Sequence, residues 1–180
     1  MKYTALSALT ETGEAGRIRG YASRFGEADQ SGDIVAPGAF ATSLQRLKTA
    51  GRTIKFLWQH DPARPIGVWH QVAENATGLW VSGEVLTEVQ LGREASVLMK
   101  AGAIDGLSIG YRVVRAEPNR ETGGRTLLEI ELWEVSLVTF PMLPSARTAP
   151  DTPAEAAPYT QEPAVTATDM EAALAEVLAS

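Results

Sequence analysis

The chain has 180 residues, of which 44% are hydrophobic and 21% charged, and its net charge is -6. This length is typical of one principal domain with a substantial core. No apolar run reaches the roughly 18 residues needed to span a bilayer, so a membrane protein is excluded. The negative net charge argues against a nucleic-acid-binding protein, because such a protein needs clustered Lys and Arg side chains to neutralise phosphates.

The chain contains no cysteine and only two histidines. Disulfides and thiolate metal sites are therefore excluded, and little remains for a histidine-rich metal centre. Residues 1–4 lack the basic segment and apolar stretch with which a secretory signal begins. We expect the protein to stay inside the cell in which it is made.

Glycine-punctuated, β-rich runs dominate the body of the chain. Six of them are predicted as strands: residues 17–25, 53–58, 66–72, 78–86, 107–114 and 125–138. Residues 37–50 and 87–101 switch to helical spacing, and each of these segments ends before a glycine. Because strands and helices do not alternate regularly, we predict an α+β fold, a mostly antiparallel β-barrel of about six or seven strands with packed helices.

A change of composition divides the body, residues 1–143, from the tail. Residues 144–167 are rich in Ala and Pro and poor in large apolar side chains, which predicts a flexible acidic linker. Residues 168–180 open with the Thr-x-x-Glu form of a capping box, which predicts a short amphipathic helix. The apolar residues at helical spacing are Met170, Leu174, Val177 and Leu178.

His60 is the first candidate for chemistry, since it follows the apolar run 56–58 and precedes a turn predicted at Asp61-Pro62. An imidazole at a strand end can serve as a general base, because its ordinary pKa lies near neutrality. A structural histidine fits the same position.

Ser108 lies between Gly106 and Gly110 on a predicted strand. Alternation places these three residues on the face opposite Leu107 and Ile109, so the hydroxyl points away from the core. The missing side chains of the glycines leave space for a substrate backbone to approach. The alternative is an ordinary strand serine. The Gly-Leu-Ser-Ile-Gly sequence matches the Gly-x-Ser-x-Gly motif of the α/β-hydrolase nucleophile elbow, but it lacks the strand-turn-helix context of that motif.

Glu134 is an acid among apolar neighbours in the last strand. A carboxylate there is costly unless it is paired, and it could orient His60 as the third member of a Ser-His-acid arrangement. An outward-facing strand acid is the alternative.

Taken together and in order, these motifs resemble the prohead (capsid maturation) proteases of tailed bacteriophages, which are distantly similar to herpesvirus assemblin. The resemblance covers roughly residues 20–146. It rests on the segments 20–25 (GYASRF), 33–40 (DIVAPGAF), 58–61 (WQHD), 65–67 (PIG), 78–79 (GL), 106–111 (GLSIGY) and 134–139 (EVSLVT).

The resemblance implies an assemblin-like fold and a serine endopeptidase in which Ser108 is the nucleophile and His60 the general base. Glu134 matches the third position of the family, where assemblin has a histidine. His70, Asp61 and Asp105 are weaker candidates for that third role.

The same resemblance implies that the substrates are the scaffold or segments of the major capsid protein, and the protease itself, inside the immature head in the host cytoplasm. Acyl transfer by these residues needs no metal or other cofactor, and no phosphate-binding loop is present. A homodimer or weak self-association is expected, with no nucleic-acid or membrane partner. The alternative is a catalytically inactive capsid assembly or scaffold protein.

Overall fold

The computed structural model describes residues 16–148, which form seven strands and two helices. The six predicted strands and both predicted helices are confirmed, with differences at their ends, and the two-residue strand β2 is an addition. The elements are β1 (Arg17–Arg24), β2 (Ile34–Val35), α1 (Ala41–Thr49), β3 (Lys55–Trp58), β4 (Asp61–Glu74), β5 (Gly78–Val85), α2 (Gln90–Lys100), β6 (Gly106–Pro118) and β7 (Arg125–Val138).

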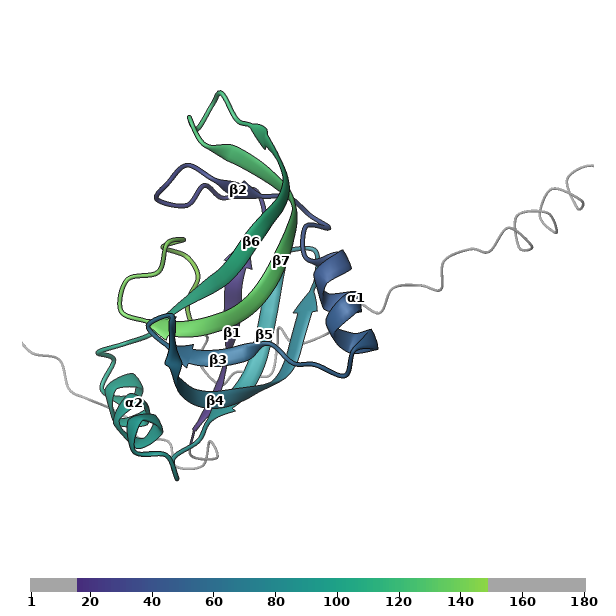
Figure 1. The fold of residues 1–180 in the computed structure, drawn as a ribbon. Helices are drawn as coiled ribbons and strands as arrows, with labels where there is room; N and C mark the ends of the chain where they lie inside the picture. The colour runs from purple at the N-terminus through teal and green to yellow at the C-terminus, as the bar shows by residue number, and fades with distance from the viewer. Residues whose placement is uncertain (1–15, 149–180) are drawn as a thin grey trace, which may run out of the picture.

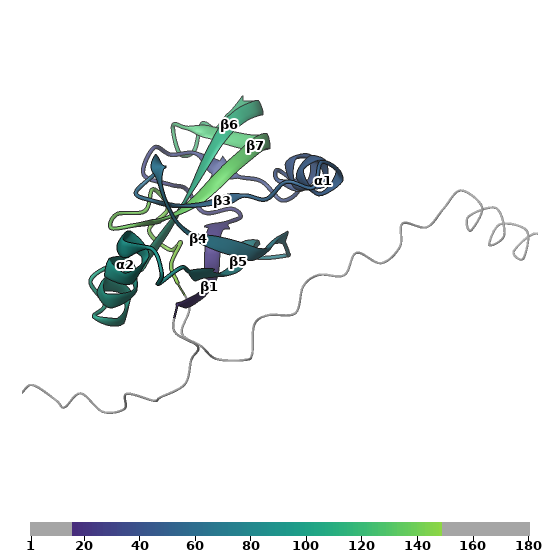
Figure 2. The same cartoon turned by 60° about the horizontal axis from the view of Figure 1, so that its bottom comes forward.

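The strands form one mixed sheet in the order β1-β5-β4-β3-β7-β2, with β6 also paired to β7. Strands β2 and β3 run parallel to β7, whereas the other paired strands are antiparallel. The sheet is strongly curled, and both helices lie outside the curl (Figures 1 and 2). Within the described residues no ladder joins β1 to β6, so the curled mixed sheet is a half-barrel and the predicted β-barrel is confirmed only in part.

The gap between the edge strands β1 and β6 is bridged at one end by the chain that follows β7. Arg147 pairs with Gly106 of β6, and Thr148 pairs with Gly20 of β1. A Cβ atom on Gly20 would lie 2.2 Å from the Arg147 carbonyl oxygen, so only glycine permits this close approach. Residues 147–148 therefore join the two edges of the sheet.

The expected domain boundary at residue 143 falls inside this packed segment. Ala146 is fully buried, and its backbone N–H donates to the carbonyl of Leu143 at 2.9 Å. The start of the predicted linker is thus part of the fold as far as residue 148. The rest of the linker and the predicted helix at 168–180 lie outside the described residues.

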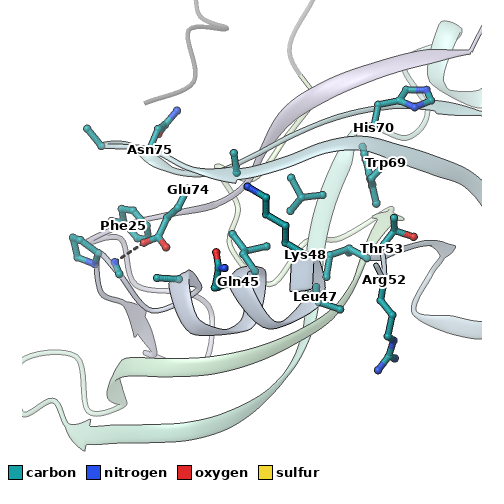
Figure 3. A pocket seen from close by; sticks show the side chains of 18 residues that line it. Phe25, Gln45, Leu47, Lys48, Arg52, Thr53, Trp69, His70, Glu74 and Asn75 are labelled. Carbon is teal, nitrogen blue, oxygen red and sulfur yellow. Dashed lines mark hydrogen bonds between the residues drawn. The ribbon is translucent and has the colours of Figure 1, made fainter. Parts of the chain in front are cut away.

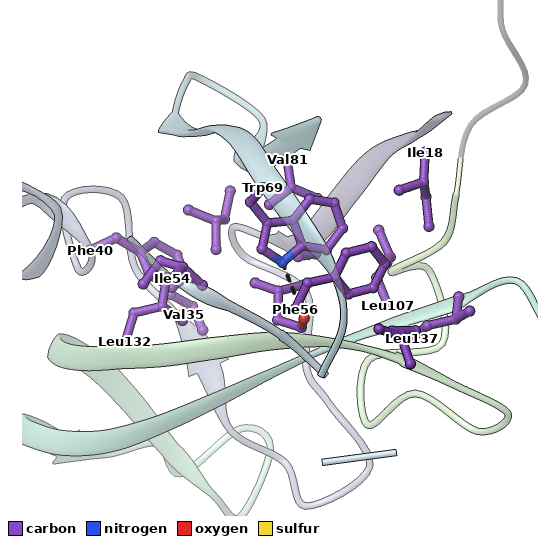
Figure 4. Close-up of a cluster of buried hydrophobic side chains, with 14 of the residues drawn as sticks. Ile18, Val35, Phe40, Ile54, Phe56, Trp69, Val81, Leu107, Leu132 and Leu137 are labelled. Carbon is purple, nitrogen blue, oxygen red and sulfur yellow. Dashed lines mark hydrogen bonds between the residues drawn. The ribbon is translucent and has the colours of Figure 1, made fainter. Parts of the chain in front are cut away.

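The core fills the inside of the curl (Figure 4). Phe56 of β3 stacks on Trp69 of β4 with ring centroids 4.1 Å apart, and the Trp69 indole donates to the carbonyl of Val135 at 3.2 Å. Leu107 of β6 and Leu137 of β7 are also fully buried there. Because side chains alternate along a strand, their neighbours Ser108 and Ser136 are directed to the opposite face.

Helix α1 packs against β7, where the Ser43 hydroxyl accepts a hydrogen bond from the backbone N–H of Leu132 at 2.9 Å. Helix α2 contacts β4 and β5. Neither helix in residues 16–148 has the length and apolar character needed to cross a membrane.

Asp33 attaches the loop before β2 to the first residue of β7. Its Oδ1 accepts hydrogen bonds from the backbone N–H of Arg125 at 2.9 Å and from the Arg125 Nε at 3.1 Å. Its Oδ2 lies 2.5 Å from the Arg125 Nη2. These hydrogen bonds hold the pKa of Asp33 below its usual range, although burial opposes them.

We predict that Asp33→Asn lowers the free energy of unfolding at pH 7 by about 1 kcal/mol. A charge-assisted hydrogen bond contributes more than this, but the Arg125 side chain is 52% exposed and solvent screens the pair. Because the folded pKa of Asp33 is depressed, its contribution is present above the unfolded value of about 3.9 and is lost as pH falls through the folded value. Urea unfolding at pH 7 and at roughly pH 2 measures both quantities.

Glu121→Gln removes the same charge from an exposed turn and is the matched control. It should leave the unfolding free energy almost unchanged at both pH values. An Asp33→Asn effect of the same size at pH 7 and at roughly pH 2 would contradict the assignment to the ion pair.

Candidate active site

Strand β7 brings two of the predicted residues to one face of the sheet. In the antiparallel ladder, Ser108 of β6 lies opposite Ser136 of β7, and Gly110 lies opposite Glu134. Directly opposed residues of paired strands project from the same face. Ser108, Ser136 and Glu134 therefore share the face of the sheet that lies away from the core.

His60 reaches this face through the tight turn between β3 and β4. Trp58 and Asp61 pair across the turn, and the two residues between them, Gln59 and His60, have φ values of 53° and 61°. Positive φ at both central residues is the requirement of a type I′ hairpin turn. The turn is therefore made by Gln59 and His60, and the predicted turn at Asp61-Pro62 is wrong because β4 begins at Asp61.

Three hydrogen bonds connect His60, Glu134 and Ser136. The His60 Nδ1 lies 2.6 Å from Oε1 of Glu134, and the Ser136 hydroxyl donates to Oε2 of the same carboxylate at 2.6 Å. The Ser136 oxygen also accepts the backbone N–H of His60 at 3.1 Å. The Glu134 side chain is 10% exposed and the His60 side chain 42%, so a largely buried carboxylate holds a ring that reaches solvent.

Gly110 provides the space for this carboxylate. A Cβ atom at Gly110 would lie 2.0 Å from the Glu134 Oε1, closer than atoms can approach. Gly106 is equally confined, since its Cβ would lie 2.6 Å from the Val138 carbonyl oxygen. The expectation that both glycines leave space for a substrate is therefore wrong, because neighbouring groups of the protein already fill those positions.

Ser108 is 5% exposed and adjoins a 180 Å³ cavity between β1 and β6. The cavity is also lined by five charged residues: Arg24, Glu27, Asp29, Asp33 and Arg125. Within the described residues no side-chain hydrogen bond joins Ser108 to His60. Hydrogen bonds of this kind often tighten only when substrate is bound.

The weaker candidates for the third role bind other partners. His70 lies 3.5 Å from Glu84 on the outside of the sheet, and Asp61 contacts Arg64 at 3.2 Å. Asp105 is paired with the guanidinium of Arg147. Among residues 16–148, no cluster of three or more His, Asp or Glu side chains is arranged to hold a metal ion.

Sequence reasoning missed Ser136 and the pair formed by Gln59 and Thr139. The Gln59 amide nitrogen donates to the Thr139 hydroxyl at 2.8 Å, which fastens the His60 turn to the chain after β7. Ser136 could have been found, because alternation places it on the same face as Glu134. The Gln59 contact could not, since it depends on the parallel pairing of β3 with β7.

Comparison with known sequences places the chain among phage proteins. The profile of the Caudovirus prohead serine protease family matches residues 4–160. The prohead protease of Enterobacteria phage HK97 is 32% identical over 135 residues, which are 74% of this chain and 59% of that protein. The prohead protease of Escherichia phage T5 is 31% identical over 127 residues, which are 69% and 58% of the two chains. The chain thus spans less than two thirds of each relative.

The fold is similar to that of a solved phage protein. The bacteriophage T4 capsid assembly protease aligns with a TM-score of 0.53 over 68% of this chain and 81% of that one, at 13% identity. The family match covers every strand and helix of the structure, and the family resemblance predicted from the motifs is confirmed. The chain therefore belongs to the family of caudovirus prohead serine proteases.

Proposed function

We propose that this chain is a serine endopeptidase in which Ser108 is the nucleophile, His60 the general base and Glu134 the residue that orients His60. The observation that carries the proposal is the 2.6 Å contact between His60 Nδ1 and Glu134, on the same face of the sheet as Ser108. A nucleophile, a base and an acid that orients the base are the three roles that acyl transfer requires.

In this proposal the two nitrogens of the imidazole have different tasks. The Nδ1–H donates to the Glu134 carboxylate, so Nε2 remains to accept the proton of the Ser108 hydroxyl. As that proton moves, the Ser108 oxygen forms a bond to the substrate carbonyl carbon. His60 then returns the proton to the leaving amine as the C–N bond breaks, and water hydrolyses the acyl-enzyme by the same route.

The substrates we propose are the major capsid protein or scaffold of an immature phage head, cleaved during maturation, and the protease itself. The relatives support this choice by name, since two are prohead proteases and the T4 protein is a capsid assembly protease. From the same relationship we propose that the reaction takes place inside the prohead, in the host cytoplasm. We include a homodimer or weak self-association in this proposal, following the assemblin resemblance.

We predict that the concentrated protein cleaves itself and that Ser108→Ala does not. Loss of the serine nucleophile lowers the rate of a protease with a Ser-His-acid triad on the order of a millionfold. The measurement is intact mass against time in a kosmotropic salt that favours association.

Ser82→Ala, on strand β5, is the matched control and should keep the wild-type rate. The same fragments from wild type and Ser108→Ala would identify a contaminating protease. Stable masses for both proteins, also after coexpression with the capsid protein, would favour an inactive assembly protein.

Glu134→Gln should reduce the self-cleavage rate by roughly 100- to 10,000-fold, since the amide cannot stabilise the imidazolium that forms during the reaction. Glu131→Gln, on the same strand, is the control because Glu131 only pairs with Arg112 at the surface. Rate constants from the mass time course compare the two variants. Equal rates for both would remove Glu134 from the proposed triad.

We predict that Gly110→Ala destabilises the wild-type protein by about 2 kcal/mol, a value typical of overpacking. The cost should shrink in a Glu134→Ala background, because the colliding carboxylate is then absent. Urea unfolding of the four proteins in this double-mutant cycle gives the coupling. A coupling of zero would mean that Gly110 is required for another reason.

A further inference from the structure

A second cavity, of 850 Å³, lies between α1 and β4, outside the candidate active site. We call it the α1–β4 groove (Figure 3). Its apolar lining includes Leu44 and Leu47 of α1, Ile54 before β3, and Val72 of β4. Leu44, Leu47 and Val72 are only partly buried, so the groove presents apolar surface that the described chain does not cover.

The charged side chains that line the groove are predominantly basic. Lys48 extends from α1 across the groove toward β4 (Figure 3), and Arg52 also contributes to the lining. Neither cation forms an ion pair with another residue of the described range 16–148. The carboxylate of the lining, Glu74, accepts the backbone N–H of Gly38. The groove therefore has an apolar lining and two exposed cations, Lys48 and Arg52, that have no ion-pair partner within residues 16–148.

The last part of the sequence has the complementary chemistry. In residues 168–180 the apolar side chains Met170, Leu174, Val177 and Leu178 have helical spacing. When the segment is drawn as a helix, Glu171 lies beside that stripe, whereas Asp169 and Glu176 lie on the opposite, polar face. A helix needs a packed apolar face to be stable at this length, because isolated helices this short are marginal in water.

The length of the apolar segment and the reach of the residues that connect it to the domain are both compatible with binding in the groove. The apolar stripe spans residues 170–178, the same number of residues as α1, so both helices would be about 13 Å long. Residues 149–167 connect the groove-bearing domain to the segment and extend up to roughly 65 Å. A domain of this size has a diameter of about 36 Å, so the segment can reach any part of its surface.

We infer that the α1–β4 groove is a docking site for the chain's own residues 168–180, which bind as an amphipathic helix with Glu171, beside the apolar stripe, facing Lys48 and Arg52. Burial of the apolar stripe supplies the favourable free energy, and the short tether makes the binding intramolecular. Docking would hold residues 149–167 against the domain as a loop fixed at both ends.

Cysteine trapping in the full chain tests this inference, because the natural sequence contains no cysteine. Gln45→Cys on α1 combined with Ala173→Cys should form an intramolecular disulfide about tenfold faster than Val97→Cys combined with Ala173→Cys. Val97 is 65% exposed on α2 and does not line the groove, so it is the matched control. Mass spectrometry after timed oxidation measures both rates.

A charge test separates docking from random collision. Lys48→Glu should slow trapping of the Gln45–Ala173 pair several-fold, whereas Lys100→Glu at the end of α2 should not. Equal trapping of the groove pair and the Val97 pair would overturn the inference. Faster trapping of Gln45→Cys with Ala5→Cys would assign the groove to the N-terminal residues, and intermolecular disulfides would assign it to a second copy.

Discussion

The candidate active site depends on the position of β7 between two strands of opposite direction. The parallel strand β3 ends beside the end of β7, so the turn that follows it carries His60 to that end. The antiparallel strand β6 begins there, so its third residue, Ser108, lies opposite Ser136. A shift of either strand by one residue would turn these side chains into the core and remove the site.

The turn that carries His60 is energetically unfavourable in isolation. Left-handed backbone costs roughly 1–2 kcal/mol for each non-glycine residue, and both Gln59 and His60 adopt it. Contacts on either side offset this cost. The Gln59 N–H donates to the Leu137 carbonyl at 3.0 Å and the His60 N–H to the Ser136 hydroxyl at 3.1 Å. Strain of this kind persists only where surrounding structure overdetermines it, and it is enriched at functional sites.

The Ser136 hydroxyl group forms the hydrogen bonds that two buried groups require, its own oxygen and the Glu134 carboxylate. A fully buried hydroxyl needs hydrogen bonds, and a largely buried carboxylate needs donors. Ser136 donates its proton to Glu134 and accepts the N–H of His60, so both requirements are met at a position with no exposed surface. The position of the imidazole therefore follows from the sheet register, because the partners of its backbone N–H and of its ring both lie on β7.

Many of the strands and the candidate site residues could be predicted from the sequence, because local sequence patterns indicate them. Alternation identified β6 and β7 and placed Ser108 away from the core, and the family motifs singled out His60 and Glu134. The turn was misplaced because proline is the stronger local signal, whereas Gln59 and His60 adopt positive φ only through contacts with β7. The function of Gly110 was missed for a related reason, since it depends on a carboxylate from another strand.

The chain after β7 connects the site to the closure of the sheet. Thr139 holds the His60 turn through Gln59, and the carbonyls of Pro141 and Met142 accept hydrogen bonds from Gln30 at 3.1 and 2.9 Å. Residues 147–148 then bridge β1 and β6. A self-cleavage between 139 and 148 would release the His60 turn or open the sheet. If the chain cleaves its own tail, as we propose, and stays active, the cut must therefore fall after residue 148, in the Ala- and Pro-rich part of the sequence.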